Sequence, residues 1–108
     1  MAIKTDNHTN GTSFHNIELK ASPRDLIEAY GQPTYLDNTG SDKINFEWEM
    51  ETDDGRAFNI YDWKEYRELE LDEQIDWHIG ALDKATSIDA LNEILRDFRN
   101  LKIEKIIK

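Results

Sequence analysis

The stretch Ile44–Gly80, INFEWEMETDDGRAFNIYDWKEYRELELDEQIDWHIG, contains all three tryptophans of the 108-residue chain and decides its fold. It opens with strict alternation of apolar and polar residues over 44–51, which is the period of a β-strand with one face in water. The residues Thr52-Asp53-Asp54-Gly55 then supply the chemistry of a tight turn. A second apolar run, Ala57–Trp63, follows the turn, so we predict a β-hairpin.

Upstream of the hairpin, residues 14–19 can form a strand and a short helix follows it. Ser22 suits the N-cap, Pro23 the first helical position, and Asp25 the place from which a capping-box carboxylate reaches back. Gly31 is expected to end this helix in a left-handed cap. Downstream, residues 75–81 read as another strand.

A second helix is predicted near the C-terminus, with Thr86 as its N-cap and Asp89 at the capping-box position. Apolar residues recur in it at spacings of three and four, and we expect this stripe to face the core: Ile88, Leu91, Ile94, Leu95 and Phe98. Residues 100–108 could continue the helix or form a terminal strand.

The predicted order is β-α-β-β-β-α, which belongs to the α+β class: a small antiparallel sheet with two helices packed on one face. We expect residues 1–10 to form a flexible N-terminal arm and residues 11–108 to form a single domain.

The chain carries a formal net charge of −10 and has no cysteine. Twelve acidic residues lie between Glu47 and Asp76, against Arg56, Lys64 and Arg67. This excess argues against direct binding of nucleic acid, because phosphates would be repelled. The absence of cysteine, of a signal peptide and of a long apolar run predicts a cytoplasmic protein with no membrane partner. The acidity itself has two interpretations: a solvated surface, or an imitation of nucleic acid that occupies a basic groove on a protein partner.

The sequence gives little sign of catalysis. The three histidines are scattered without the spacing of a metal site, and no nucleotide-hydrolysis or acyl-transfer loop occurs. Alternating glutamates on a strand, such as Glu47 and Glu49, are typical of a solvent face. We therefore expect no enzymatic activity, no metal and no cofactor.

A binding site is better supported. Trp63, Tyr66 and Trp77 fall at strand ends or in connections, where aromatic rings can stay open for a base to stack. Arg56, Lys64 and His78 would supply donors near these rings. The competing interpretation is that these tryptophans fill the core, as we expect for Trp48.

Several segments of residues 11–95 together resemble a family of small phage-encoded proteins. They are Gly11-Thr12-Ser13, the helix 25–31 with Gln32-Pro33-Thr34-Tyr35, Asp42-Lys43, Glu47-Trp48, Asp54-Gly55, Ile60-Tyr61-Asp62-Trp63-Lys64 and Trp77-His78-Ile79-Gly80. The most specific are Y-D-W-K and W-H-I-G. The acidic stretch 65–74 and the lysine-rich tail have no counterpart in the family.

This resemblance suggests the viral sponges of the anti-CBASS type. It implies a counter-defence protein in the host cytoplasm that sequesters a cyclic-nucleotide immune signal without cleaving it. It also implies a homo-oligomer with binding sites at or near the subunit contacts. The ligand-binding residues proposed from the matching segments are Thr12, Ser13, Tyr61, Trp63, Lys64, Trp77 and His78. Two alternatives stay open: an acidic inhibitor of a basic host protein, similar to an anti-CRISPR decoy, and an accessory phage protein without a small ligand.

Overall fold

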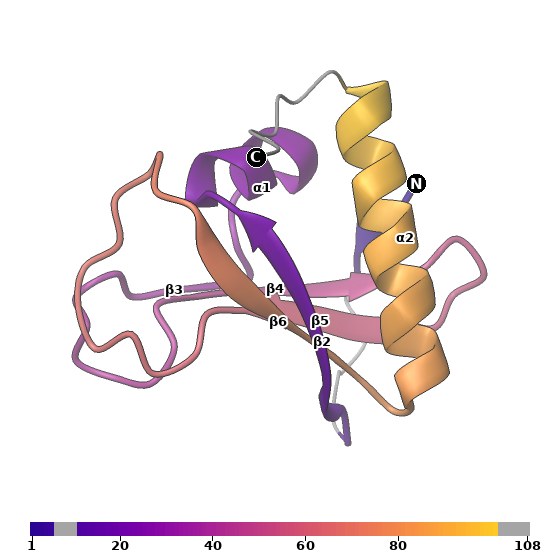
Figure 1. Cartoon of the computed structure of the whole chain (residues 1–108), viewed down its shortest axis with the longest axis horizontal. Coiled ribbons are helices and arrows are strands. Elements are labelled where there is room, and N and C mark those ends of the chain that lie inside the picture. The colour runs from indigo at the N-terminus through magenta and orange to yellow at the C-terminus, as the bar shows by residue number, and fades with distance from the viewer. Residues whose placement is uncertain (6–10, 102–108) are drawn as a thin grey trace.

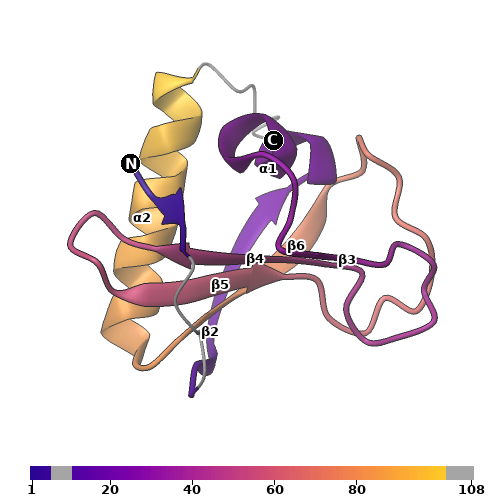
Figure 2. The same cartoon turned by 180° about the vertical axis from the view of Figure 1, so that it is seen from behind.

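The computed structural model describes residues 1–5 and 11–101, and within them six strands form one antiparallel sheet. The elements are β1 (Ile3–Lys4), β2 (Ser13–Ala21), α1 (Pro23–Tyr30), β3 (Tyr35–Leu36), β4 (Phe46–Glu51), β5 (Ala57–Tyr61), β6 (Ile75–Ala81) and α2 (Lys84–Asn100). The sheet order is β1-β4-β5-β6-β2, and β3 also pairs with β4. Figures 1 and 2 show both helices on the same side of the sheet, so the predicted α+β class is confirmed.

The predicted hairpin forms as β4 and β5. Glu47 lies opposite Tyr61 and Glu51 opposite Ala57, and the turn between the strands closes with hydrogen bonds between Thr52 and both Gly55 and Arg56. Alternation sorts the side chains as the sequence predicts. One face of β4, β5 and β6 is apolar, packs toward the helices and is buried, and its residues include Phe46, Trp48, Met50, Phe58, Ile60, Trp77 and Ile79.

Helix α1 begins as predicted. Ser22 is the N-cap, its hydroxyl accepts from the Asp25 N–H, and the Asp25 carboxylate accepts from the Ser22 N–H at 3.0 Å. At the other end, Gly31 takes a φ of 79° and its N–H donates to the Ile27 carbonyl. Its ψ of −163° lies outside the left-handed helical region, so the predicted left-handed cap is wrong although the position of the helix end is right.

Helix α2 begins earlier than predicted. Its N-cap is Asp83, whose side chain accepts from the Thr86 N–H, so Thr86 lies in the first turn and is not the cap. The predicted core stripe is also partly wrong: Ile94 and Phe98 are buried, whereas Ile88 and Leu95 are exposed. The core face is completed by residues that periodicity did not favour, among them the polar Ser87 and Asp97.

The predicted N-terminal arm is wrong for residues 1–5. Ile3 and Lys4 form β1 and pair with Glu51 and Met50, and Ala2 is buried in the core. The Ala2 N–H donates to the Asp97 carboxylate at 3.0 Å, and the N-terminal ammonium contacts Asp53. The start of the chain therefore belongs to the domain. Residues 6–10 and 102–108 lie outside the described residues. Whether the C-terminal tail continues the helix or forms a strand therefore lies outside them too.

Candidate functional site

The site forms where the hairpin ends and the chain leaves β5. Asp62 is buried there, and its carboxylate accepts hydrogen bonds from the N–H groups of Asn45 and Phe46 at 2.8–3.1 Å. The Asp62 carboxylate thus takes the place of a backbone carbonyl as the acceptor for these N–H groups, and the pairing of β5 with β4 ends there. Burial raises the pKa of Asp62, while the bonds from the Asn45 and Phe46 N–H groups counteract part of that rise.

Beyond Asp62 the chain turns sharply and presents Trp63. Lys64 and Tyr66 both adopt left-handed backbone conformations, with φ of 57° and 53°. Such φ values are uncommon for residues other than glycine and cost energy, so surrounding contacts must hold them. One of these contacts is the Lys64 N–H, which donates to the Lys43 carbonyl at 2.7 Å.

The loop that follows is anchored to the loop 37–43. The side chain of Asn38 forms a pair of hydrogen bonds with the backbone N–H and carbonyl of Leu69, both at 2.8 Å, and Leu69 itself is buried. The two loops also approach backbone to backbone, because a Cβ on Gly40 would lie 2.4 Å from the Arg67 Cα. These contacts fix the position of Trp63 from both sides.

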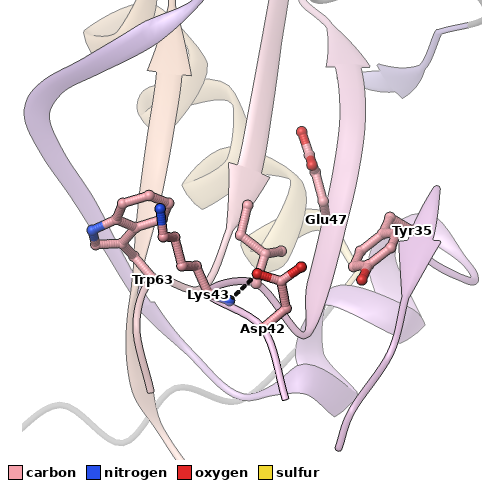
Figure 3. Close-up of a pocket in the computed structure, with 6 residues that line it drawn as sticks. Tyr35, Asp42, Lys43, Glu47 and Trp63 are labelled. Carbon is pink, nitrogen blue, oxygen red and sulfur yellow. Dashed lines mark hydrogen bonds between the residues drawn. The ribbon is translucent and has the colours of Figure 1, made fainter. Parts of the chain in front are cut away.

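Trp63 is 38 % exposed, and two cations lie near its ring. The Nζ atoms of Lys64 and Lys43 are 5.5 and 5.9 Å from its ring centroid, which is within cation–π range. Beside the ring is an open pocket of about 280 Å³, lined by Tyr35, Asp42, Lys43, Ile44, Glu47 and Trp63. Figure 3 shows Trp63 and Lys43 on one side of this pocket and Tyr35 on the other, with the two carboxylates between them.

An aromatic row continues from Trp63 across the sheet face that the helices leave open. Tyr61 meets Trp63 edge to face at 6.0 Å, and the His78 ring lies 5.3 Å from that of Tyr61. Phe14 stacks on His78 with ring centroids 3.7 Å apart. Burial lowers the pKa of His78, and Glu18, whose carboxylate lies 3.7 Å from Nε2, partly offsets that effect.

The structure brings together only some of the residues proposed from the sequence. Trp63 lines the pocket, Lys64 lies over the Trp63 ring without lining the pocket, and Tyr61 and His78 contact Trp63 through their rings. Trp77 does not join this group. Its ring is 0 % exposed and its indole N–H donates to the Ala21 carbonyl, so the prediction that this ring stays accessible is wrong.

Thr12 and Ser13 also lie away from the pocket. Ser13 is opposite Ala81, three residues along β6 from His78, which is a separation of about 10 Å. Ala81 belongs to the buried side of β6, so Ser13 is on the face toward the helices, whereas His78 is on the open face.

Sequence reasoning missed Tyr35, Lys43 and Phe14. Lys43 could have been found from the hairpin register. Glu47 pairs with Tyr61 and Trp48 with Ile60, so the same register carried three residues further places 44 opposite 64, with Lys43 next to it. Phe14 gave no such signal, because the β2–β6 register shifts between Phe14 and Glu18, where Asn16 takes a φ of 66°.

In the described part of the chain, no three histidine, aspartate or glutamate side chains cluster as a metal site would require. Nor is any helix there long and apolar enough to cross a membrane. A scan against models of known protein families finds no match for this chain. A search of curated proteins likewise finds no significant relative.

Proposed function

We propose that the protein binds a small nucleotide beside Trp63 and retains it without cleaving it. The observation that carries this proposal is the half-open indole ring with two lysine ammonium groups near its face, at the rim of a pocket. Stacking of a base on an exposed aromatic ring contributes about 1–3 kcal/mol. The ammonium groups of Lys43 and Lys64 can bind a phosphate of such a ligand.

The other pocket residues suit the edge of a base. The carboxylates of Asp42 and Glu47 can accept hydrogen bonds from amino and ring N–H groups, and the Tyr35 ring lines the opposite wall. A volume of about 280 Å³ lies just below the usual range for ligand sites, about 300–1,000 Å³. It fits one nucleoside, so a larger ligand would extend across Trp63 onto the open sheet face.

The negative charge of the whole chain does not exclude a phosphate-bearing ligand. Screening over a Debye length of about 8 Å at physiological salt makes the nearest charges dominate. The two lysine ammonium groups lie 5.5 and 5.9 Å from the Trp63 ring centroid, whereas the Asp42 and Glu47 carboxylates lie between that ring and Tyr35, where a base edge would contact them. The left-handed backbone of Lys64 is a further support, since strained residues gather at binding sites.

The resemblance of the Y-D-W-K and W-H-I-G segments to phage proteins supports a specific form of the proposal. In that form the ligand is a cyclic-nucleotide immune signal, and the protein acts in the host cytoplasm as a stoichiometric sponge, assembled as a homo-oligomer. No chemical step is then required of any residue, because stacking on Trp63 and charge from the lysines suffice to retain the ligand.

The test is a binding titration with cyclic dinucleotides, larger cyclic nucleotides and ADP-ribose derivatives. Trp48 and Trp77 are buried, so quenching of tryptophan fluorescence by a stacked base reports on Trp63. A ligand at 100 times its Kd should also add about 2.7 kcal/mol to the free energy of unfolding. Recovery of the intact ligand after denaturation checks that it is not cleaved.

The double variant Trp63→Ala/Lys64→Ala should lose binding. Tyr66→Ala is the matched control, because Tyr66 is an aromatic residue of the same loop, is 55 % exposed and does not line the pocket. Absence of binding across the panel would reject the proposal, and equal loss in the double variant and the control would place the site elsewhere.

A second candidate function is inhibition of a basic host protein. It is favoured by the acidic row Glu47, Glu49 and Glu51, which lies on the open face of β4. Binding of this kind weakens steeply with salt. It should be abolished by charge reversal along this row and unaffected by Trp63→Ala/Lys64→Ala, which separates the two functions.

A further inference from the structure

Strand β2 ends the sheet among the described residues, since no strand pairs with its outer side. An unpaired edge offers a row of backbone N–H and carbonyl groups to another strand. The opposite edge differs, because β4 is covered there by both β1 and β3. The bulge at Asn16 interrupts β2, and the regular part that could pair is therefore Ile17–Ala21.

The side chains of this segment can pair with those of a second, antiparallel copy of the same segment. Glu18 and Lys20 lie on the open face, and Ile17, Leu19 and Ala21 lie on the face toward the helices. In an antiparallel pair centred on Leu19, residue 18 of one strand faces residue 20 of the other. Each glutamate then meets a lysine, while Ile17 meets Ala21 and Leu19 meets its own copy.

Charges on the neighbouring strand fit the same register. Lys20 forms an ion pair with Asp76 at 3.0 Å, and Glu18 lies near His78. Across the centred pair, charges would alternate on the open face along the row Asp76, Lys20 and Glu18 of the partner subunit. A pair centred one residue away on Glu18 or Lys20 would place like charges opposite each other, which is destabilising.

Helix α2 adds an independent observation at the same edge. It packs mainly on β2 and β6. One flank of α2 faces the β4–β5 turn, where Glu93 accepts from the Asp53 N–H and Arg96 pairs with Asp53. The helix advances about 100° per residue, so Ile88, Leu91 and Leu95 lie on the other flank, across the buried face from Glu93 and Arg96.

That flank is apolar and only partly covered. Ile88 is 41 % and Leu95 37 % exposed, although both belong to a helix whose buried face already packs on the sheet. A second copy paired along β2 would bring its own α2 toward this flank, because the helices of both copies lie on the same side of the joined sheet. One two-fold axis thus accounts for the free edge, the charge order and the apolar flank.

We propose that the protein forms a symmetric homodimer in which two copies pair antiparallel along β2, with Leu19 opposite Leu19 of the partner subunit. The interface is isologous, and each copy contributes Glu18, Lys20 and the Ile88–Leu95 flank of α2. The interface lies at the β2 edge and does not include the Trp63 pocket. The dimer and the proposed nucleotide site can therefore be tested independently, and failure of one does not contradict the other.

The test is sedimentation velocity of the full chain over a concentration series. The wild type should shift from one chain to two. Glu18→Lys places lysine opposite Lys20 of the partner subunit at two symmetric positions, and it should raise the dimer Kd about tenfold. Glu18→Lys/Lys20→Glu/Asp76→Lys restores opposite charges in this register, keeps an ion pair between positions 20 and 76, and should recover most of that loss. Glu49→Lys is the matched control, with the same charge change on the same face of β4.

A second pair of variants tests the helix flank. Leu95→Glu should weaken the dimer, whereas Leu36→Glu on β3, at the opposite sheet edge, should not. Circular dichroism and the unfolding midpoint of each variant check that the fold persists. A wild type that stays monomeric at all concentrations would overturn the proposal. So would a dimer that Glu18→Lys and Leu95→Glu leave unchanged, or one that the charge swap fails to restore.

Discussion

The hydroxyl of Tyr30 donates a hydrogen bond of 2.6 Å to the carboxylate of Asp97, and both residues are buried. The same carboxylate accepts from the Ala2 N–H, so one side chain of α2 joins the end of α1 and the start of the chain. Burial and this hydrogen bond raise the pKa of Tyr30, which keeps the phenol protonated as the donor. The packing of both helices and β1 meets at this carboxylate.

Tyr30→Phe should therefore lower the free energy of unfolding by about 1–3 kcal/mol, because it leaves a buried charged acceptor with one fewer donor. Chemical denaturation measures the change. Tyr66→Phe is the control, since Tyr66 is exposed and its loss of a hydroxyl should change stability by less than about 0.5 kcal/mol. Equal midpoints for Tyr30→Phe and the wild type would show that the Tyr30–Asp97 bond contributes nothing net.

Gly80 of the W-H-I-G segment is required by the side chain of the adjacent strand. A Cβ at this position would lie 2.2 Å from Asn59 Oδ1, and the Asn59 amide is held by Glu47 at 2.9 Å. Gly80→Ala should cost about 1–3 kcal/mol through overpacking. Adding Asn59→Ala removes the clashing side chain and should recover most of this loss relative to Asn59→Ala alone. A double-mutant cycle with no coupling would contradict the steric account.

The parts of the fold that local pattern decides were predictable. The hairpin follows from alternation over 44–51 and a turn, and α1 follows from a capping box within four residues. Strand β1 was not predictable, because its pairing with β4 joins residues about 47 positions apart and no periodicity marks residues 3–4. The prediction of which α2 residues face the core failed for a similar reason. Asp97 is buried because distant Tyr30 and Ala2 satisfy it, and this turns Leu95 outward.

Part of the error in predicting the site residues could have been avoided. The alternation of β6 puts Trp77 on the same face as Ile75 and Ile79, which already favours burial of its ring. Trp63 is different, since it follows the strand end that Asp62 creates. The contact between Lys64 and the Trp63 ring depends on a left-handed residue, which no pattern in the sequence indicates.

The start of α2 can be tested by its cap. Asp83→Ala should lower the unfolding midpoint, because it removes the acceptor of the Thr86 N–H, whereas Asp83→Asn should keep most of the stability as another good N-cap. The hydrogen bonds from Thr86 lower the pKa of Asp83. Its stabilising contribution is therefore present above the ordinary aspartate pKa and disappears as the pH falls through the lowered value. A pH-independent difference between the wild type and Asp83→Asn would contradict this assignment.

The stack of Phe14 on His78 makes a pH-dependent prediction for the open sheet face. Burial lowers the pKa of His78 from the ordinary 6.5, and Phe14 covers one side of the ring. Phe14→Ala should admit water and raise this pKa toward its ordinary value, whereas Glu18→Gln should lower it further by removing a nearby negative charge. Histidine ring resonances measured against pH report both shifts, with His78→Gln to assign the signal.

The sign of the linked stability follows from the direction of that shift. Because the folded state holds the His78 proton less tightly than the unfolded chain, His78 stabilises the fold above the ordinary histidine pKa. This contribution is lost as the pH falls through the lowered value. The unfolding free energy of the wild type should therefore fall over this interval relative to His78→Gln, and the difference should shrink in Phe14→Ala. A shift of the His78 pKa in the opposite direction on removal of Phe14 would show that the ring contact does not exclude water.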